Sequence, residues 1–297
     1  MTPAQDLQGR TALVTGANTG IGRVTAETLA AWGAHVFLAC RSEEKAVPVV
    51  EAIEAAGGRA TFLPLDLGDF ASVRACAEGF LARGEGLDLC IANAGLAGWR
   101  GRTRSGFEQC FGVNHLGHYL LVRLLEPALR QAARPSAPAR VVVVSSQSHY
   151  DAPGIDFEAV TRATKTRTTM AEYAVSKLAN VLFAKEISRR WADAPVLAAS
   201  LHPGVIASDI WREVPAPIRW IMKRFMISVE EGAQTTLHCA TAAGIEPGGY
   251  YTKSRLKTPS KPAQDAGLAV ELWDRSAAFV GLPAAGEESA PASSPLG

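Results

Sequence analysis

The 297-residue sequence lacks several patterns that mark particular classes of protein. Its five cysteines are scattered, with no Cys-x-x-Cys pair and no other metal-ligand spacing. No run approaches the roughly 18 apolar residues of a membrane span. Residues 1–10 are polar and contain no apolar signal segment. We therefore expect buried, reduced thiols in a cytoplasmic protein that has no transmembrane segment.

The sequence also lacks an excess of either charge, because its formal net charge is +1. Without a basic field there is no argument for nucleic-acid binding. The hydrophobic fraction of 47% is high enough for a sizeable core. This composition fits one large α/β domain or two small ones.

Short apolar segments alternate with helical patterns along most of the chain. Each apolar segment is continuously hydrophobic, which is typical of a parallel, doubly wound sheet with helices on both faces. We predict a single Rossmann-type domain over 1–282 with about seven strands, and a disordered tail over 283–297 that is small, polar and proline-rich. The expected strands are 11–15, 35–39, 60–65, 87–91, 140–144, 196–201 and one near Tyr250. The expected helices are one that follows Gly22 and runs through Trp32, 43–56, 69–83, one carrying Asn114, one carrying Tyr173, 229–242 and one near 262–280.

A glycine-rich turn, Gly16-x-x-x-Gly20-x-Gly22, joins the first strand to the first helix. Glycines let backbone N–H groups approach a phosphate at the positive end of a helix dipole. The flanking strand and helix favour phosphate binding over a plain strand–helix turn.

The end of the second strand reads Ala39-Cys40-Arg41, at the position where a dinucleotide fold contacts the adenosine ribose. An acid there would favour the 2′-hydroxyl of NAD, whereas arginine suits a 2′-phosphate. Arg41 therefore predicts NADP (NADPH) in preference to NAD. The alternative is a solvated arginine at the start of the next helix.

Further polar or small residues follow the other strands. Asp66-Leu67 is placed to bind an adenine edge, and Asn93-Ala94-Gly95 leaves room for a ribose. Ser146 follows the strand 140–144. Because ligands of open α/β sheets bind beyond the carboxyl ends of the strands, these residues are expected around one crevice.

Tyr173 and Lys177 lie four residues apart in a predicted helix and therefore on one face. A nearby ammonium lowers the pKa of a phenol from about 10, so that the tyrosine can exchange a proton near neutral pH. Among the five tyrosines only Tyr173 is followed at this spacing by a lysine. The alternative is an exposed lysine beside a half-buried tyrosine.

Two other features have competing interpretations. His115 and His118 share a helical face, but no acid or cysteine completes a metal-ligand set, so packing is favoured and no metal is predicted. The segment 205–227 is rich in large apolar side chains, including Trp211 and Trp220. We expect it to cover an apolar substrate pocket. Ordinary core packing, or weak contact of a basic amphipathic helix with a membrane surface, are the alternatives.

Together and in this order, these motifs resemble the short-chain dehydrogenase/reductase family, over about residues 9–281. They are Thr15-Gly16-x-x-x-Gly20-Ile21-Gly22, Asp66-Leu67, Asn93-Ala94-Gly95, Asn114, Ser146, Tyr173-x-x-x-Lys177 and Pro203-Gly204. The closer similarity is to the retinol dehydrogenase and related dehydrogenase/reductase branch. It is carried by Leu38-Ala-Cys-Arg41, Ser145-Ser-Gln-Ser-His149 and Ser176-Lys-Leu-Ala-Asn180.

The resemblance implies an oxidoreductase that interconverts a small-molecule alcohol and carbonyl. Tyr173 would exchange the proton at the substrate oxygen, and Ser146 would hydrogen-bond that oxygen. Lys177 would bind the nicotinamide ribose and lower the tyrosine pKa, and Asn114 would hold a water that links Lys177 to solvent. The cofactor site implied is Gly16, Asn18, Thr19, Gly20, Ile21, Gly22, Arg41, Asp66, Leu67, Asn93, Ala94, Gly95, Tyr173, Lys177, Pro203, Gly204 and Ile206. A homo-oligomer is left open.

The sequence departs from the family pattern in two places. The gap between Ser146 and Tyr173 is longer than usual by an insertion over 151–169, interpreted as a loop near the site. The amino-terminal membrane anchor of several members of the branch is not seen, which weakens a specific expectation of retinoids.

Two other functions stay open: a dinucleotide-binding regulator without turnover, and a sugar-nucleotide epimerase or dehydratase. Retention of Tyr173 and Lys177 speaks against the first, and the glycine spacing speaks against the second.

Overall fold

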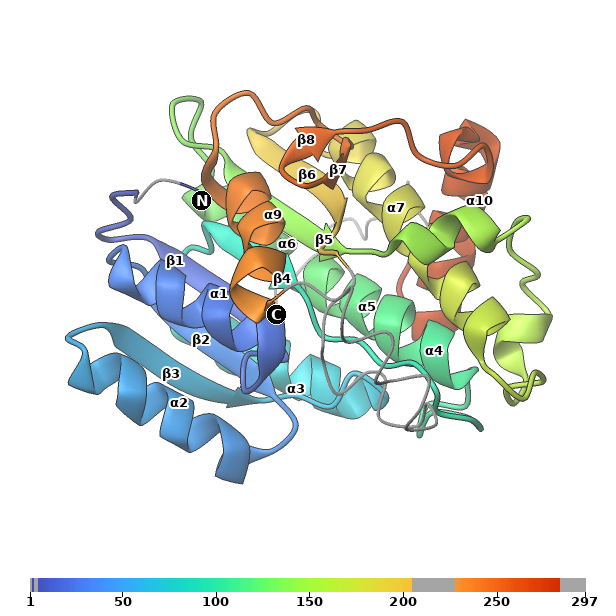
Figure 1. Cartoon of the computed structure of the whole chain (residues 1–297), viewed down its shortest axis with the longest axis horizontal. Coiled ribbons are helices and arrows are strands. Elements are labelled where there is room, and N and C mark those ends of the chain that lie inside the picture. Colours follow the sequence, from blue (N-terminus) through green and yellow to red (C-terminus); the bar gives the residue numbers. More distant parts are fainter. Residues whose placement is uncertain (1, 3–4, 205–227, 284–297) are drawn as a thin grey trace, which may run out of the picture.

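A sheet runs through the middle of the molecule, with its strands in the order β3-β2-β1-β4-β5-β6-β7-β8 (Figure 1). The computed structural model describes residues 2, 5–204 and 228–283. The predicted cover over 205–227, with Ile206 and Trp211, lies outside the described residues, as does nearly all of the predicted disordered tail. The strands are β1 (Thr11–Thr15), β2 (His35–Cys40), β3 (Arg59–Pro64), β4 (Leu89–Ala92), β5 (Ala139–Val144), β6 (Val196–His202), β7 (Tyr250–Thr252) and β8 (Arg255–Leu256).

The sheet confirms the predicted parallel, doubly wound architecture. The strands β1 to β7 pair in parallel, and β8 alone pairs antiparallel, with β7. The prediction missed β8, because a strand of two residues shows no periodicity. Lys253 and Ser254 form its hairpin turn, and both have positive φ.

Helices cover both faces of the sheet (Figure 1). The helices α1, α2 and α9 pack on one face, and α3, α5 and α7 pack on the other, with α10 against α7. Their bounds are α1 (Gly20–Ala31), α2 (Glu43–Ala55), α3 (Phe70–Leu81), α4 (Gln109–Phe111), α5 (Gly117–Leu124), α6 (Glu126–Ala132), α7 (Met170–Arg190), α9 (Val229–Thr241) and α10 (Ala266–Val280).

Each face of the sheet has its own hydrophobic core. Leu13 belongs to the core beneath α3, α5 and α7, and its neighbour Val14 belongs to the core beneath α1 and α9. Both side chains are fully buried. Because successive residues of a strand point to opposite faces, a strand covered on both sides must be apolar throughout. This is why β1 appears in the sequence as an unbroken hydrophobic run.

Two predicted helices differ from the structure. The single helix expected around Asn114 is α4, then a π-helical turn η1 (Gly112–Leu116), then α5. The helix expected from 262 begins with a 3₁₀ turn η5 (Pro262–Gln264). The regular helix α10 starts only after Asp265, whose side chain caps it by accepting from the Leu268 N–H.

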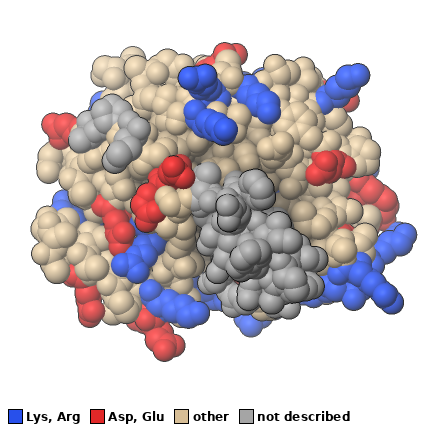
Figure 2. All heavy atoms as spheres, viewed as in Figure 1, with Lys and Arg blue, Asp and Glu red and all other residues tan. Residues whose placement is uncertain are grey.

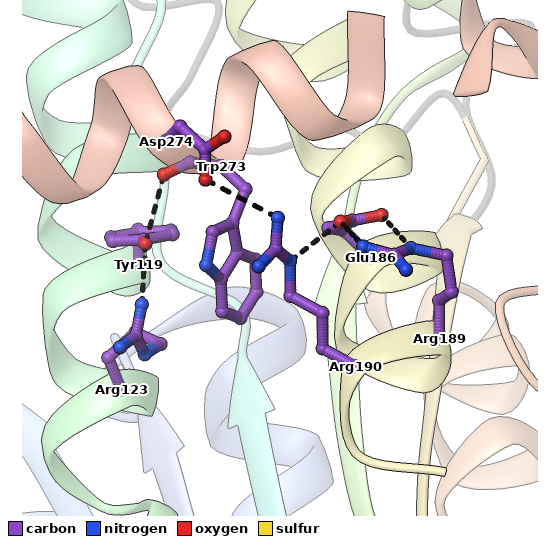
Figure 3. Close-up of polar contacts among 7 residues, drawn as sticks. All are labelled: Tyr119, Arg123, Glu186, Arg189, Arg190, Trp273 and Asp274. Atoms are coloured by element: carbon purple, nitrogen blue, oxygen red, sulfur yellow. Dashed lines mark hydrogen bonds and ion pairs between the residues drawn. The ribbon is translucent and has the colours of Figure 1, made fainter. Parts of the chain in front are cut away.

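A network of polar and aromatic side chains fastens α10 to α5 and α7 (Figure 3). The guanidinium groups of Arg123 on α5 and Arg190 on α7 lie 4.8 and 4.9 Å from the Trp273 ring centroid. The Tyr119 hydroxyl donates to the Trp273 carbonyl at 3.1 Å. The buried Glu186 carboxylate accepts from Arg190 Nε at 2.6 Å. These contacts fix the carboxyl-terminal half of α7, the helix that carries Tyr173.

Side chains of both charges occur across the face shown in Figure 2. This distribution accompanies the formal net charge of +1. Within the residues that the structure describes, no helix is both long and apolar enough to cross a bilayer. All five cysteines are buried and unpaired, as predicted.

Candidate active site

A cleft of about 1200 Å³ opens at the carboxyl ends of the parallel strands. It lies where the strand order reverses, between β1 and β4, the usual ligand site of such a sheet. The cleft brings together most of the residues predicted to form the site. They are Gly16, Asn18, Thr19, Gly20, Ile21, Gly22, Arg41, Asp66, Leu67, Asn93, Ala94, Gly95, Ser146, Tyr173, Lys177, Pro203 and Gly204.

The glycine turn is tightly folded at the amino terminus of α1, and only at Gly20 would an added Cβ atom meet no atom within 4 Å. A Cβ atom on Gly22 would lie 2.4 Å from the Gly16 carbonyl oxygen, and Gly16 itself has a φ of +65°. Thr19, at the N-cap of α1, makes no side-chain capping bond. The first N–H groups of the helix are therefore free to face a phosphate, which fits a dinucleotide cofactor.

The turn after β4 is bonded to the end of β1. The backbone N–H groups of Asn93 and Ala94 each donate to Thr15 Oγ1 at 2.9 Å. Asn93 Nδ2 donates to the Thr15 carbonyl at 2.9 Å. These bonds hold the two loops that border the cofactor half of the cleft. The sequence pattern placed both loops at the crevice but did not predict that Thr15 joins them.

The region after β2 presents unpaired positive charge to the cleft. Arg41, Ser42 and Lys45 all line it. Within the described part of the chain, neither cationic side chain has a hydrogen bond or an ion pair, and Ser42 makes no side-chain capping bond to α2. Ser42 and Lys45 were not predicted. Lys45 lies in the first turn of α2, only four residues after Arg41, and this short spacing between two cations is the signal that could have found the lysine.

Tyr173 and Lys177 lie one turn apart on α7 and face the cleft, as the spacing predicted. The Lys177 ammonium lies 5.5 Å from the centroid of the Tyr173 ring. It donates to the Val144 carbonyl at 3.1 Å. Burial lowers the pKa of Lys177 to about 8. The lysine therefore carries its charge at neutral pH but lies close to its titration point.

The predicted lowering of the Tyr173 pKa is wrong for this state of the protein. Burial raises the pKa of Tyr173 to about 12, and the Ser146 side chain opposes the shift only in part. The Lys177 ammonium lies over the ring and bonds to a backbone carbonyl, so desolvation of the phenol dominates. The tyrosine consequently holds its proton here, ready to act as an acid.

Ser146 borders the cleft at the start of a 3₁₀ turn, η2 (Gln147–Asp151), where its Oγ accepts from the Ser148 N–H at 3.2 Å. The buried His149 ring supports this serine. Its Nδ1 donates to the Ser146 carbonyl at 2.7 Å, and its Nε2 accepts from the Ser260 N–H at 3.1 Å. The supporting role of His149 was not predicted, because Ser260 is distant in sequence.

Asn114 is not among the residues that line the cleft. Its fully buried side chain accepts from the Leu96 N–H at 2.8 Å and donates to the Ser176 hydroxyl at 3.0 Å. A Cβ atom on Gly95 would lie 3.4 Å from both Asn114 Oδ1 and Lys177 Nζ. Asn114 therefore stands directly behind the cleft wall, beside the lysine.

The insertion over 151–169 lies beside the site. Thr164 donates to Glu108 Oε1 at 2.5 Å and accepts from the Gly101 N–H at 3.1 Å. Thr169 accepts from the Gly98 N–H at 2.9 Å. The insertion thus supports the loop 96–105, on which the exposed Trp99 borders the cleft.

The two histidines are packed in the interior, the interpretation that the sequence favoured, and their rings have different partners. His115 Nε2 lies 2.9 Å from the Ser276 hydroxyl, whereas His118 Nε2 lies 2.8 Å from the Thr15 hydroxyl. Both rings are fully buried. Within the described ranges, no group of three or more metal-ligating side chains is placed to hold an ion.

Comparison with known proteins gives the family. The model for short chain dehydrogenases matches residues 10–218. The chain belongs to the short-chain dehydrogenase/reductase family. Human retinol dehydrogenase 11 is 40% identical over 95% of this chain and 89% of its own length. Human dehydrogenase/reductase SDR family member 13 is 40% identical over 98% of this chain and 78% of its own.

A solved structure supports the same conclusion. An uncharacterized protein from Mycobacterium paratuberculosis shares the fold with a TM-score of 0.76 and 31% identity, over 94% of this chain and 96% of that one. The family model and the retinol dehydrogenase relatives support an oxidoreductase that uses NAD(P), and the predicted resemblance to the retinol dehydrogenase branch is confirmed.

Proposed function

We propose that this protein is an NADP-dependent oxidoreductase that interconverts an alcohol and a carbonyl on an apolar small molecule, with Tyr173 as general acid and base. The observation that carries the proposal is the convergence of Tyr173, Lys177 and Ser146 on the cleft that also holds the glycine turn. The pair of unpaired cations at Arg41 and Lys45 supports NADP in particular.

The residues at the cleft can perform the proton half of the reaction. A bound nicotinamide cofactor would supply or accept the hydride. Tyr173, protonated at neutral pH with a pKa of about 12, can donate to a carbonyl oxygen during reduction. The Ser146 hydroxyl can hydrogen-bond the same oxygen. The nearby Lys177 ammonium would stabilise the phenolate that remains, because the attraction is strong in a site with little water.

The surroundings of Tyr173 favour an apolar substrate. Its ring packs with Ala97 and Cys110, and the partly buried Leu96 packs against this cluster. Trp99 adds an exposed aromatic face at the border of the cleft. Since human retinol dehydrogenase 11 is named for an apolar alcohol, retinoids belong among the substrates to test.

A panel of aliphatic aldehydes, ketones and retinoids, assayed with NADPH and NADH, tests the proposal. On a confirmed substrate, Tyr173→Phe should lower kcat about 10²- to 10⁴-fold and leave the Kd for NADPH nearly unchanged. The matched control is Tyr251→Phe on β7, whose hydroxyl accepts from the Glu246 N–H. Normal turnover by Tyr173→Phe would refute the catalytic assignment. Tight NADPH binding without turnover of any substrate would favour the regulator.

A further inference from the structure

The fully buried His118 lies between the cofactor loops and Asn114, and touches both through its two ring nitrogens. Nδ1 is 3.0 Å from the Asn114 backbone carbonyl, and Nε2 is 2.8 Å from Thr15 Oγ1. The ring lies in α5, one turn beyond the π-helical turn η1 that contains Asn114. It does not line the cleft.

The surrounding hydrogen bonds fix which nitrogen carries the proton. A carbonyl oxygen can only accept, so Nδ1 must be the donor to Asn114. Burial lowers the pKa of His118 to about 4, so the ring is neutral and Nε2 accepts. The Thr15 hydroxyl then donates to Nε2 while its oxygen accepts from the Asn93 and Ala94 N–H groups. Every contact of the ring has a donor and an acceptor.

The two ring nitrogens of His118 are connected by hydrogen bonds to different parts of the site. At the Nε2 end, Thr15 holds the turn at Asn93 and Ala94, which borders the cofactor half of the cleft. At the Nδ1 end, the ring bonds to the backbone of Asn114, whose side-chain Nδ2 donates to the Ser176 hydroxyl, and that hydroxyl donates to the Tyr173 carbonyl at 2.7 Å. The second path therefore reaches the turn of α7 that carries the tyrosine.

We propose that His118 is a positioning residue that couples the cofactor loops to the turn of α7 that carries Tyr173. Its Nε2 acts on the cofactor loops through Thr15, and its Nδ1 acts on α7 through Asn114. The inference rests on the proposed function. It predicts that the two nitrogens have separable effects: the Nε2 contact supports cofactor affinity, and the Nδ1 contact supports turnover. A residue that merely fills space would show no such separation.

Two amide substitutions separate the nitrogens, because each amide reaches the position of one ring nitrogen only. The amide of asparagine can occupy the Nδ1 position, so His118→Asn keeps the bond to Asn114 and loses the bond to Thr15. The longer glutamine reaches the Nε2 position, so His118→Gln keeps the bond to Thr15 and loses the bond to Asn114. One hydrogen bond is lost in each variant, which corresponds to about a five- to tenfold effect.

The experiment measures NADPH Kd by fluorescence titration, and kcat at saturating NADPH, for both variants. His118→Asn should raise Kd about five- to tenfold with kcat within about twofold of wild type. His118→Gln should lower kcat about five- to tenfold with Kd within about twofold. The matched control is His115→Asn, which removes a second buried ring of the same helical segment that bonds to Ser276. It should lower Tm and leave both constants unchanged.

Three outcomes would overturn the inference. In the first, the NADPH Kd and kcat change together in both His118 variants. In the second, neither constant changes in either variant. In the third, His115→Asn changes one constant as a His118 variant does. If the wild-type protein binds NADPH and turns over a substrate, any of these results rejects only the role of His118. If the wild-type protein neither binds NADPH nor reduces any substrate, the proposed function itself fails.

Discussion

The Lys177 ammonium is held by the backbone carbonyl of Val144, the last residue of β5, at 3.1 Å. The same carbonyl accepts from Asn180 Nδ2 at 3.0 Å. Two side chains of α7, nearly one turn apart, are therefore fastened to the carboxyl end of a central strand. The sheet, and not a loop, sets the position of the lysine in the cleft.

The burial of Lys177 predicts a specific dependence of stability on pH. Its pKa falls from the ordinary value near 10.5 to about 8 in the folded protein. Between these values the unfolded chain binds more protons than the folded one, so this group makes stability rise with pH from about 8 to about 10.5. Urea unfolding of the cofactor-free protein at pH 8 and pH 10 should reveal the effect as a difference from Lys177→Met.

Comparison with Lys177→Met removes the contributions of other groups that titrate in this window. The free-energy difference between the two proteins should change by about 1–3 kcal/mol from pH 8 to pH 10, with wild type gaining relative to the variant. A difference that stays constant across the window would mean that the lysine is not desolvated in the folded protein.

The cations after β2 predict the preference between cofactors. Arg41→Asp should reverse a preference for NADPH, because it replaces a partner of the 2′-phosphate by a like charge. Lys45→Met should lower NADPH affinity about tenfold and leave NADH affinity unchanged, since only NADPH carries that phosphate. The control is Lys261→Met, which removes a cation that does not line the cleft. Equal kcat/KM for the two cofactors in the parent protein would contradict the assignment.

Most of the fold and of the cleft could be predicted from local sequence. The strand β5 and the helix that carries Tyr173 have strong periodicity, and the glycine turn lies between a clear strand and helix. Residues at the ends of parallel strands must meet at one edge of the sheet, so the position of Ser146 also followed.

The predictions failed where long-range packing decides the outcome. The π-helical turn at Asn114 has no periodic signature, and its bonds run to Leu96 and Ser176. The raised pKa of Tyr173 depends on burial by elements distant in sequence, which spacing to Lys177 alone does not report. The same limit applies to Thr15 and His118, which meet across more than a hundred residues.

The close approach of two loops at Gly22 predicts that a single methyl group would disrupt the cofactor site. An alanine Cβ there would lie 2.4 Å from the Gly16 carbonyl oxygen and 2.5 Å from Asn93 Nδ2. Gly22→Ala should weaken NADPH binding by at least about tenfold and lower Tm, because backbone must shift to relieve the contact.

Gly79→Ala is the matched control for Gly22→Ala. Gly79 lies in α3, where an added Cβ would meet no atom within 4 Å. Alanine is favoured over glycine in a helix by about 1 kcal/mol, so this variant should raise Tm slightly and leave NADPH binding unchanged. Equal loss of NADPH binding in both variants would rule out a local effect at the turn.

The contact between Thr164 and Glu108 predicts how the insertion shapes the substrate side of the cleft. Thr164→Val removes the hydroxyl that donates to the buried Glu108 carboxyl and accepts from the Gly101 N–H. The carboxyl is already desolvated, which raises its pKa, and it would lose a polar partner. We expect the insertion to open locally more often, while the two main cores stay intact.

Limited trypsin digestion should detect this opening, because Arg162, Lys165 and Arg167 lie exposed in the insertion. Cleavage there should accelerate about tenfold in Thr164→Val, because the loss of one hydrogen bond raises the population of the open insertion by about that factor. The Tm should change only slightly. Thr161→Val is the control, since among the described residues that hydroxyl bonds only to the nearby Glu158 carbonyl.

Because the insertion supports the loop that carries Trp99, KM for bulky apolar substrates should rise more than KM for small aldehydes. Unchanged cleavage together with an equal rise in KM for all substrates would show that the insertion does not shape the substrate side of the cleft.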